Sequence, residues 1–174
     1  MPLIQALKPG APLTPAGDAE QAIDISSTDV SGDVLLPIDP LHVARIYGVP
    51  VFQYPLDSDL SGYLDWDNRG AFIVVNSHDS AVRQRFTIAH ELGHFYDTYR
   101  RKLPRAKKDR GSLASKGTDI EEVYANRFAA ALLMPAKAVR AKFNVVPDVG
   151  ALARIFNVSE QAMSNRLHNL GLTA

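Results

Sequence analysis

The sequence predicts an α+β fold in which a small antiparallel β-sheet packs on a metal-binding helix and on a second helix that carries a further ligand. Three observations predict this fold. Short β-type runs lie between residues 51 and 76, and a turn over residues 67–70 joins the last two as a hairpin. A proline-free segment with a His-Glu-x-x-His motif follows them. Apolar residues at helical spacing fill much of the remaining chain.

Length and composition limit the number of domains, the kinds of partner and the available zinc ligands. The 174 residues suffice for one domain, and 46% of them are hydrophobic, enough for a real core. Lys+Arg and Asp+Glu number 19 each, so no global charge favours nucleic acid as a partner. The chain has no Cys, so a zinc ion would need His and carboxylate ligands. With no signal-peptide pattern and no apolar run of membrane-spanning length, we expect a cytoplasmic protein that makes no membrane contact.

Three regions follow from the distribution of Pro, Gly and apolar residues. Residues 1–37 are predicted to form an irregular N-terminal arm, because four prolines interrupt the first 15 residues. A short helix around residues 17–25 is a weakly signalled alternative, and the arm could also pack across the domain. Residues 38–143 are predicted to form the core. Residues 144–174 are predicted to form a helical pair packed on it.

The core begins with a short helix, for which Asp39 is the predicted N-cap and Pro40 the first helical residue. Strands are then predicted over residues 51–54, 62–66 and 71–76. An edge of this sheet, if free, could pair with an extended peptide substrate, which is a known mode of peptide recognition.

The His-Glu-x-x-His motif spans His90, Glu91 and His94. Residues four apart lie on one face of an α-helix, so the two imidazoles can bind one Zn²⁺. A catalytic zinc keeps a coordination position open for water and activates that water for hydrolysis. Glu91 lies beside the pair and is the candidate general base, which passes the proton to the leaving amine. The alternative is a buried helix whose two histidines only form hydrogen bonds.

A third ligand is expected from the next helix, where Glu121 and Glu122 are consecutive and point about 100° apart. Only one of them can face the metal. The periodicity favours Glu122, because small residues on its side of the helix would let two helices approach closely. Glu121 stays open on spacing alone.

Two motifs together resemble the ImmA/IrrE family of zinc metallopeptidases. They are Arg85-Phe86-Thr87-x-Ala89-His90-Glu91-Leu92-Gly93-His94 and Glu122-x-x-Ala125-Asn126-x-Phe128-Ala129-Ala130-x-Leu132-Leu133-Met134-Pro135. The resemblance covers residues 39–143. It implies zincin-like architecture, with His90, His94 and Glu122 as zinc ligands and Glu91 as the base. It also implies an endopeptidase that cleaves a helix-turn-helix transcriptional repressor in stress response or mobile-element induction. A non-catalytic, antitoxin-like regulator on the same scaffold is the rival hypothesis.

Supporting residues are less strongly indicated. Asp97 lies one turn beyond His94 and is a candidate partner for that ligand, while Asn126 lies one turn beyond Glu122 and is a candidate to orient it. A donor that stabilises the oxyanion or contacts substrate is also expected. The candidates are Tyr96, Tyr124, His78 and Arg85.

The two remaining segments have open roles. Residues 100–116 are strongly basic, and we predict a solvated loop, an active-site lid or a patch for an acidic partner. Residues 149–168 have a helix-turn-helix-like spacing, in which Ser159 caps the second helix. We do not expect direct DNA binding, because only Arg154 and Arg166 are basic there and Glu160 would lie near the phosphates.

Overall fold

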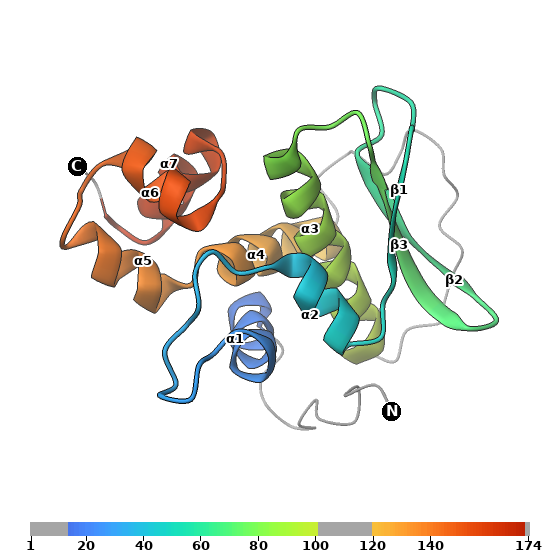
Figure 1. The fold of residues 1–174 in the computed structure, drawn as a ribbon, viewed down its shortest axis with the longest axis horizontal. Coiled ribbons are helices and arrows are strands. Elements are labelled where there is room, and N and C mark those ends of the chain that lie inside the picture. Colours follow the sequence, from blue (N-terminus) through green and yellow to red (C-terminus); the bar gives the residue numbers. More distant parts are fainter. Residues whose placement is uncertain (1–13, 101–119, 173–174) are drawn as a thin grey trace.

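The computed structural model describes residues 14–100 and 120–172, and Figure 1 shows how its helices and strands are arranged. A long central helix separates a small sheet on one side from a group of C-terminal helices on the other. The helices are α1 (Pro15–Ser26), α2 (Pro40–Ile46), α3 (Ala81–Arg100), α4 (Ile120–Leu133), α5 (Ala136–Phe143), α6 (Val149–Phe156) and α7 (Glu160–Asn169). The strands are β1 (Val51–Tyr54), β2 (Gly62–Asp67) and β3 (Gly70–Asn76).

The sheet is mixed, which corrects the prediction of a purely antiparallel one. Its strand order is β1-β3-β2, with β2 antiparallel and β1 parallel to β3. The predicted hairpin of β2 and β3 is therefore confirmed. Strand β1 pairs with the other edge of β3, so that β3 is the central strand. The physical reason is burial: β3 is the most apolar run and occupies the centre, whereas β1 is largely exposed and forms an edge.

The two faces of the sheet differ. One face carries Ile73 and Val75, which are fully buried, and packs on α3. Residues on the other face line a hollow of about 530 Å³: Phe52, Tyr54, Pro55, Leu56, Tyr63, Asp67, Arg69, Phe72 and Val74. Because side chains alternate along a strand, this hollow opens on the side of the sheet away from α3.

The N-terminal region contains the short helix that was the alternative to a wholly irregular arm. Residues 15–26 form α1. Thr14 is its N-cap, and the Thr14 Oγ1 accepts a hydrogen bond from Gly17 N–H. Asp18, Ala19, Ala22 and Ile23 are buried, and the helix packs chiefly against α4. Pro15 suits the first helical position, but Gly17 lowers the helix propensity, and the small alanines allow the close packing that stabilises the helix.

The C-terminal helices follow the predicted turn chemistry. Asp148 accepts from Ala151 N–H at the start of α6, and Ser159 accepts from Ala162 N–H at the start of α7. Asn157, between them, adopts the left-handed conformation with φ 51°. Leu152, Phe156 and other buried side chains join the hydrophobic core of the remaining chain.

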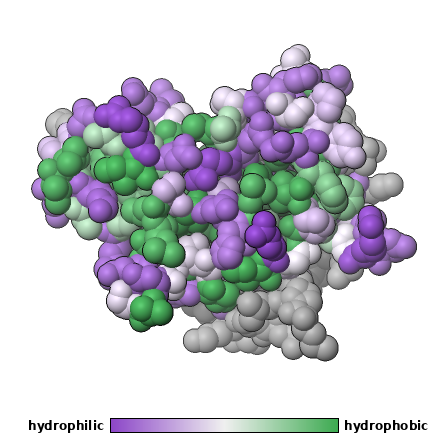
Figure 2. Space-filling model, viewed as in Figure 1, coloured by the Kyte–Doolittle hydropathy of each residue, from purple (hydrophilic) through white to green (hydrophobic). Residues whose placement is uncertain are grey.

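On the side of the molecule drawn in Figure 1, the surface mixes hydrophilic and hydrophobic residues, as Figure 2 shows. Of the helices in residues 14–100 and 120–172, none is long and apolar enough to cross a membrane. The basic segment 100–116 and the cap expected at Thr118 or Asp119 lie outside the described residues, apart from Arg100, the last residue of α3.

Candidate metal centre

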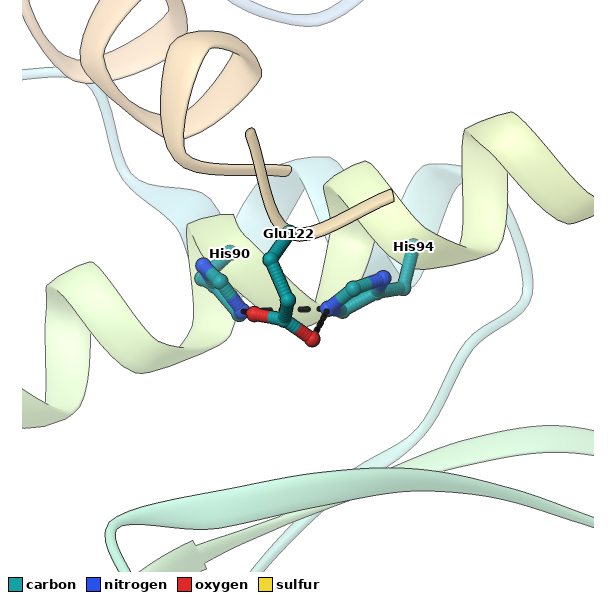
Figure 3. Close-up of side chains that lie close together, drawn as sticks. All are labelled: His90, His94 and Glu122. Carbon is teal, nitrogen blue, oxygen red and sulfur yellow. Dashed lines mark hydrogen bonds and ion pairs between the residues drawn. The ribbon is translucent and has the colours of Figure 1, made fainter. Parts of the chain in front are cut away.

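Three side chains from two helices converge on one point between them. His90 and His94 project from the same face of α3, and Glu122 reaches them from the first turn of α4 (Figure 3). Glu122 Oε1 lies 3.1 Å from His94 Nε2, and Glu122 Oε2 lies 3.3 Å from His90 Nε2. The two Nε2 atoms are 3.1 Å apart. The helical spacing thus presents both imidazoles to one carboxylate.

These donors fit a divalent metal ion. One ligand atom from each residue lies within 4.8 Å of the others, close enough to surround one ion. Two imidazole nitrogens and one carboxylate oxygen form the donor set that catalytic zinc accepts while it keeps a position for water. Glu121, the alternative ligand, is not part of the cluster.

The site is enclosed, which sets the protonation of His90. The side chains of His90 and Glu122 are each 16% exposed, and that of His94 is 12% exposed. Burial, followed by the nearby charge of His94, lowers the pKa of His90 from 6.5 to about 4, against the opposing effect of Glu122. The imidazole is therefore neutral at physiological pH, the state in which it binds a metal.

Asn126 contacts the site differently from the prediction. It was expected to orient Glu122, but its Oδ1 lies 3.1 Å from His90 Nδ1. When Nδ1–H donates to this oxygen, the lone pair of His90 is on Nε2, the atom that faces His94 and Glu122. With its proton held there, His90 would be in the tautomer that a metal requires.

Close packing of α3 and α4 brings the ligands together. Gly93 lies between the two histidines, and a Cβ at this position would lie 2.8 Å from Ala125 Cα. Only the absence of a side chain allows this approach. Gly93 is part of the first motif, but its spacing in the sequence gives no sign that it allows the two helices to pack closely.

Glu91 and Asp97 both lie on α3 and are nearly enclosed, at 9% and 4% exposure. A buried carboxylate is costly unless it is paired or hydrogen-bonded. Their assigned roles, as base and as partner of His94, stay predictions.

Two of the candidate oxyanion or substrate contacts are core residues instead. Tyr96 is fully buried, with its ring 5.0 Å from that of Tyr47 and 4.9 Å from that of Phe128. Tyr124 is 5% exposed and its hydroxyl donates to Asp18 of α1. Because residues two apart on a helix point to nearly opposite sides, Tyr96 and Tyr124 face away from His94 and Glu122.

The other two candidates also lie elsewhere. Arg85 donates from Nη2 to Ile38 O at 2.7 Å and from Nε to Asn157 O at 3.2 Å, so it joins the C-terminal helices to the core. His78 is exposed in the turn before α3, and its backbone N–H donates to Asn76 Oδ1. Neither side chain is shown to reach the cluster.

Sequence analysis missed two buried polar residues that organise the surroundings. Asn76, at the end of β3, accepts from Leu56 N–H and donates to the carbonyls of Leu56, Asp57 and Leu60. Asp18 is fully buried in α1, within the stretch 17–25 for which a helix was only the weaker alternative. An isolated Asn or Asp has no periodic signal, so neither residue could be identified without the fold.

The His-His-Glu cluster on two helices beside a small sheet has the donor set of a metallopeptidase-type domain. The profile of the peptidase M78 family, the IrrE N-terminal-like domain, matches residues 44–168. The chain belongs to this family, the ImmA/IrrE family, as its two motifs predicted.

Two relatives illustrate the likeness. The uncharacterized immunity region protein 2 of Bacillus phage phi105 is 33% identical over 97 residues, which are 56% of this chain and 59% of that protein. A Mycobacterium tuberculosis transcriptional regulator has a similar fold, with a TM-score of 0.63 and 22% identity over 88% of this chain and 46% of its own. This chain thus spans about half the length of the relatives it matches.

Proposed function

We propose that this chain is a zinc-dependent endopeptidase that hydrolyses a peptide bond in a helix-turn-helix transcriptional repressor. The observation that carries the proposal is the convergence of His90, His94 and Glu122 within 4.8 Å. Membership of a peptidase family supports hydrolysis of a peptide bond. The relatives are named as an immunity-region protein and a transcriptional regulator, and both names favour a substrate that takes part in regulation.

Each residue has one task in this proposal. Bound Zn²⁺ supplies a Lewis acid that polarises the scissile carbonyl and makes water a stronger acid. His90 and His94 present Nε2 and Glu122 presents a carboxylate oxygen to the ion. Asn126 keeps the proton of His90 on Nδ1. The carboxylate of Glu91 takes a proton from the attacking water and delivers it to the leaving amide nitrogen.

The experiment incubates the purified, zinc-loaded chain with candidate helix-turn-helix repressors, beginning with any that a neighbouring gene encodes, and identifies the products by mass spectrometry. Glu91→Gln should retain zinc and lose at least about a hundredfold in rate, since a positioned general base contributes roughly 10²–10⁴-fold. Glu121→Gln is the matched control and should cleave at the wild-type rate.

The rival is a non-catalytic regulator on the same scaffold. Equal regulation of the target promoter by wild type and Glu91→Gln, with the repressor intact in both, would establish that rival and refute the peptidase. Because α7 exposes Gln161, Ser164, Asn165 and His168, a gel shift with the chain's own promoter tests direct DNA contact. We expect no specific shift.

A further inference from the structure

Helix α1 lies outside the part of the chain that matches the family, yet it packs directly on a ligand-bearing helix. The family profile begins at residue 44, whereas α1 spans Pro15–Ser26 and contacts mainly α4. Asp18, Ala19 and Ala22 of α1 are 0% exposed. The small alanines let the helices approach, and Asp18 places a carboxylate in the interface.

The carboxylate of Asp18 accepts a hydrogen bond from the hydroxyl of Tyr124. A buried carboxylate is costly unless it is hydrogen-bonded, so this contact has a defined geometry that apolar packing lacks. Asp18 also stands in the first turn of α1, where the helix dipole favours a negative charge. The contact therefore joins α1 to α4 at one specific atom pair.

Tyr124 and Glu122 are two residues apart near the start of α4. They point about 200° apart around the helix axis, so one faces α1 while the other faces His90 and His94. Glu122 lies in the first turn, where the backbone N–H groups have no partner within the helix. Tyr124, at 5% exposure, is the first buried residue of α4.

We propose that Asp18 is a positioning residue: by holding the Tyr124 hydroxyl, it fixes the rotation of α4 and thereby the place of the Glu122 carboxylate beside His90 and His94. The inference rests on the proposed function only in taking this cluster as the metal site. It extends the functional unit to a helix that the family profile does not include.

A small rotation is enough to matter. A carboxylate about 5 Å from the helix axis moves by about 0.9 Å when the helix turns by about 10°. Metal–ligand distances hold to about 0.2 Å, so such a displacement exceeds what a bound ion accepts. Loss of the bond between Asp18 and Tyr124 should therefore reach the metal through Glu122, although neither residue touches the ion.

The test measures binding of Zn²⁺ alone to the full chain, in competition with a chelating dye, together with the visible absorption of the Co²⁺ form. Asp18→Leu and Tyr124→Phe each remove one partner and keep much of the volume. Both should bind Zn²⁺ about tenfold more weakly, the lower end of the loss seen when a residue that orients a metal ligand is mutated, and should change the Co²⁺ spectrum. Asp18→Asn keeps an oxygen acceptor and should bind within about threefold of wild type.

Two further variants separate positioning from stability. The double variant Asp18→Leu/Tyr124→Phe replaces both partners by apolar groups, which restores much of the unfolding free energy. Its zinc affinity should stay low, because the hydrogen bond that sets the rotation of α4 against α1 is still missing. Leu152→Ala, which truncates a fully buried side chain of α6, should lower stability and leave zinc affinity unchanged.

Two results would overturn the proposal. One is wild-type zinc affinity, within about twofold, and an unaltered Co²⁺ spectrum in folded Asp18→Leu and Tyr124→Phe. The other is recovery of affinity together with stability in the double variant, which would show a merely structural role. A wild-type chain that binds zinc with the expected variant pattern but cleaves no repressor would refute the proposed function and leave this inference standing.

Discussion

His90 Nδ1 lies 3.1 Å from Asn126 Oδ1, and this contact joins the metal-binding helix to the helix that carries Glu122. Asn126 follows Glu122 by one helical turn, so both residues face α3. One face of α4 therefore carries both Glu122 and a residue that contacts His90. This arrangement makes the position of α4 relative to α3 the decisive feature of the site.

Replacement of Asn126 by Ala should weaken zinc binding about tenfold, because His90 loses the acceptor that holds its proton on Nδ1. Competition with a chelating dye measures the affinity. Arg127→Ala, at an exposed neighbouring position, is the matched control and should bind as wild type does. Unchanged affinity in Asn126→Ala would mean that the amide does not set the tautomer of His90.

Replacement of Gly93 by Ala should separate α3 from α4, because the new Cβ would lie 2.8 Å from Ala125 Cα and 3.1 Å from its carbonyl oxygen. We expect a loss of about 1–3 kcal/mol in the free energy of unfolding, as for other overpacked sites, together with weaker zinc binding. Urea titration and dye competition measure the two effects.

Gly150→Ala is the control for this helix substitution. Its Cβ would meet the ends of the Glu160, Arg154 and Asp148 side chains at 3.2–3.6 Å, and these can move aside. We expect Gly150→Ala to be neutral or stabilising, since Ala has the higher helix propensity. Equal effects of the two substitutions would show that close packing at Gly93 is unimportant.

The metal-free chain should lose stability as the pH falls from 6.5 toward 4. Burial holds the pKa of His90 at about 4, below its ordinary value of 6.5. Between these two pH values His90 is protonated in the unfolded chain and neutral in the native chain, so a lower pH favours unfolding. The stability that depends on neutral His90 is fully present above pH 6.5. Its loss at low pH lowers the free energy of unfolding by about 3 kcal/mol at most.

Urea unfolding at several pH values, with a chelator present, measures this dependence. His90→Gln should reduce the slope of stability against pH in this window by up to about 1.4 kcal/mol per pH unit. The same slope in wild type and His90→Gln would contradict the assigned pKa shift.

Replacement of Asn76 by Ala should destabilise the chain by about 2–3 kcal/mol, because the part-buried backbone groups of Leu56 and Leu60 lose the amide that bonds them. Thermal unfolding measures the loss. Ser77→Ala, at the exposed next position, should stay within about 0.5 kcal/mol of wild type. A neutral Asn76→Ala would show that the loop between β1 and β2 holds itself in place.

Local patterns predicted much of this structure. The caps at Asp39 and Ser159 could be recognised because a capping side chain bonds within a few residues of itself. The grouping of His90 with His94 follows from helical spacing alone, and Glu122 was favoured by periodicity and by the family motif. These features depend on neighbours in the sequence.

Features that depend on distant partners could not be predicted. The parallel pairing of β1 with β3 requires knowledge of which strand is central. Helix α1 is stabilised by its packing on α4 and not by its own propensity. The contacting residues Asp18 and Tyr124 are 106 positions apart in the sequence. Tyr96 and Tyr124 were candidate substrate contacts because a tyrosine near a motif has the same local signal whether it faces the site or the core.

The most direct test is the zinc content and affinity of Glu122→Ala beside Glu121→Ala, measured by elemental analysis and dye competition on the full chain. The account predicts one zinc ion per chain in wild type and in Glu121→Ala, and a loss of at least about a hundredfold in affinity in Glu122→Ala, since a ligand itself is removed. Full zinc content and wild-type affinity in Glu122→Ala would contradict it.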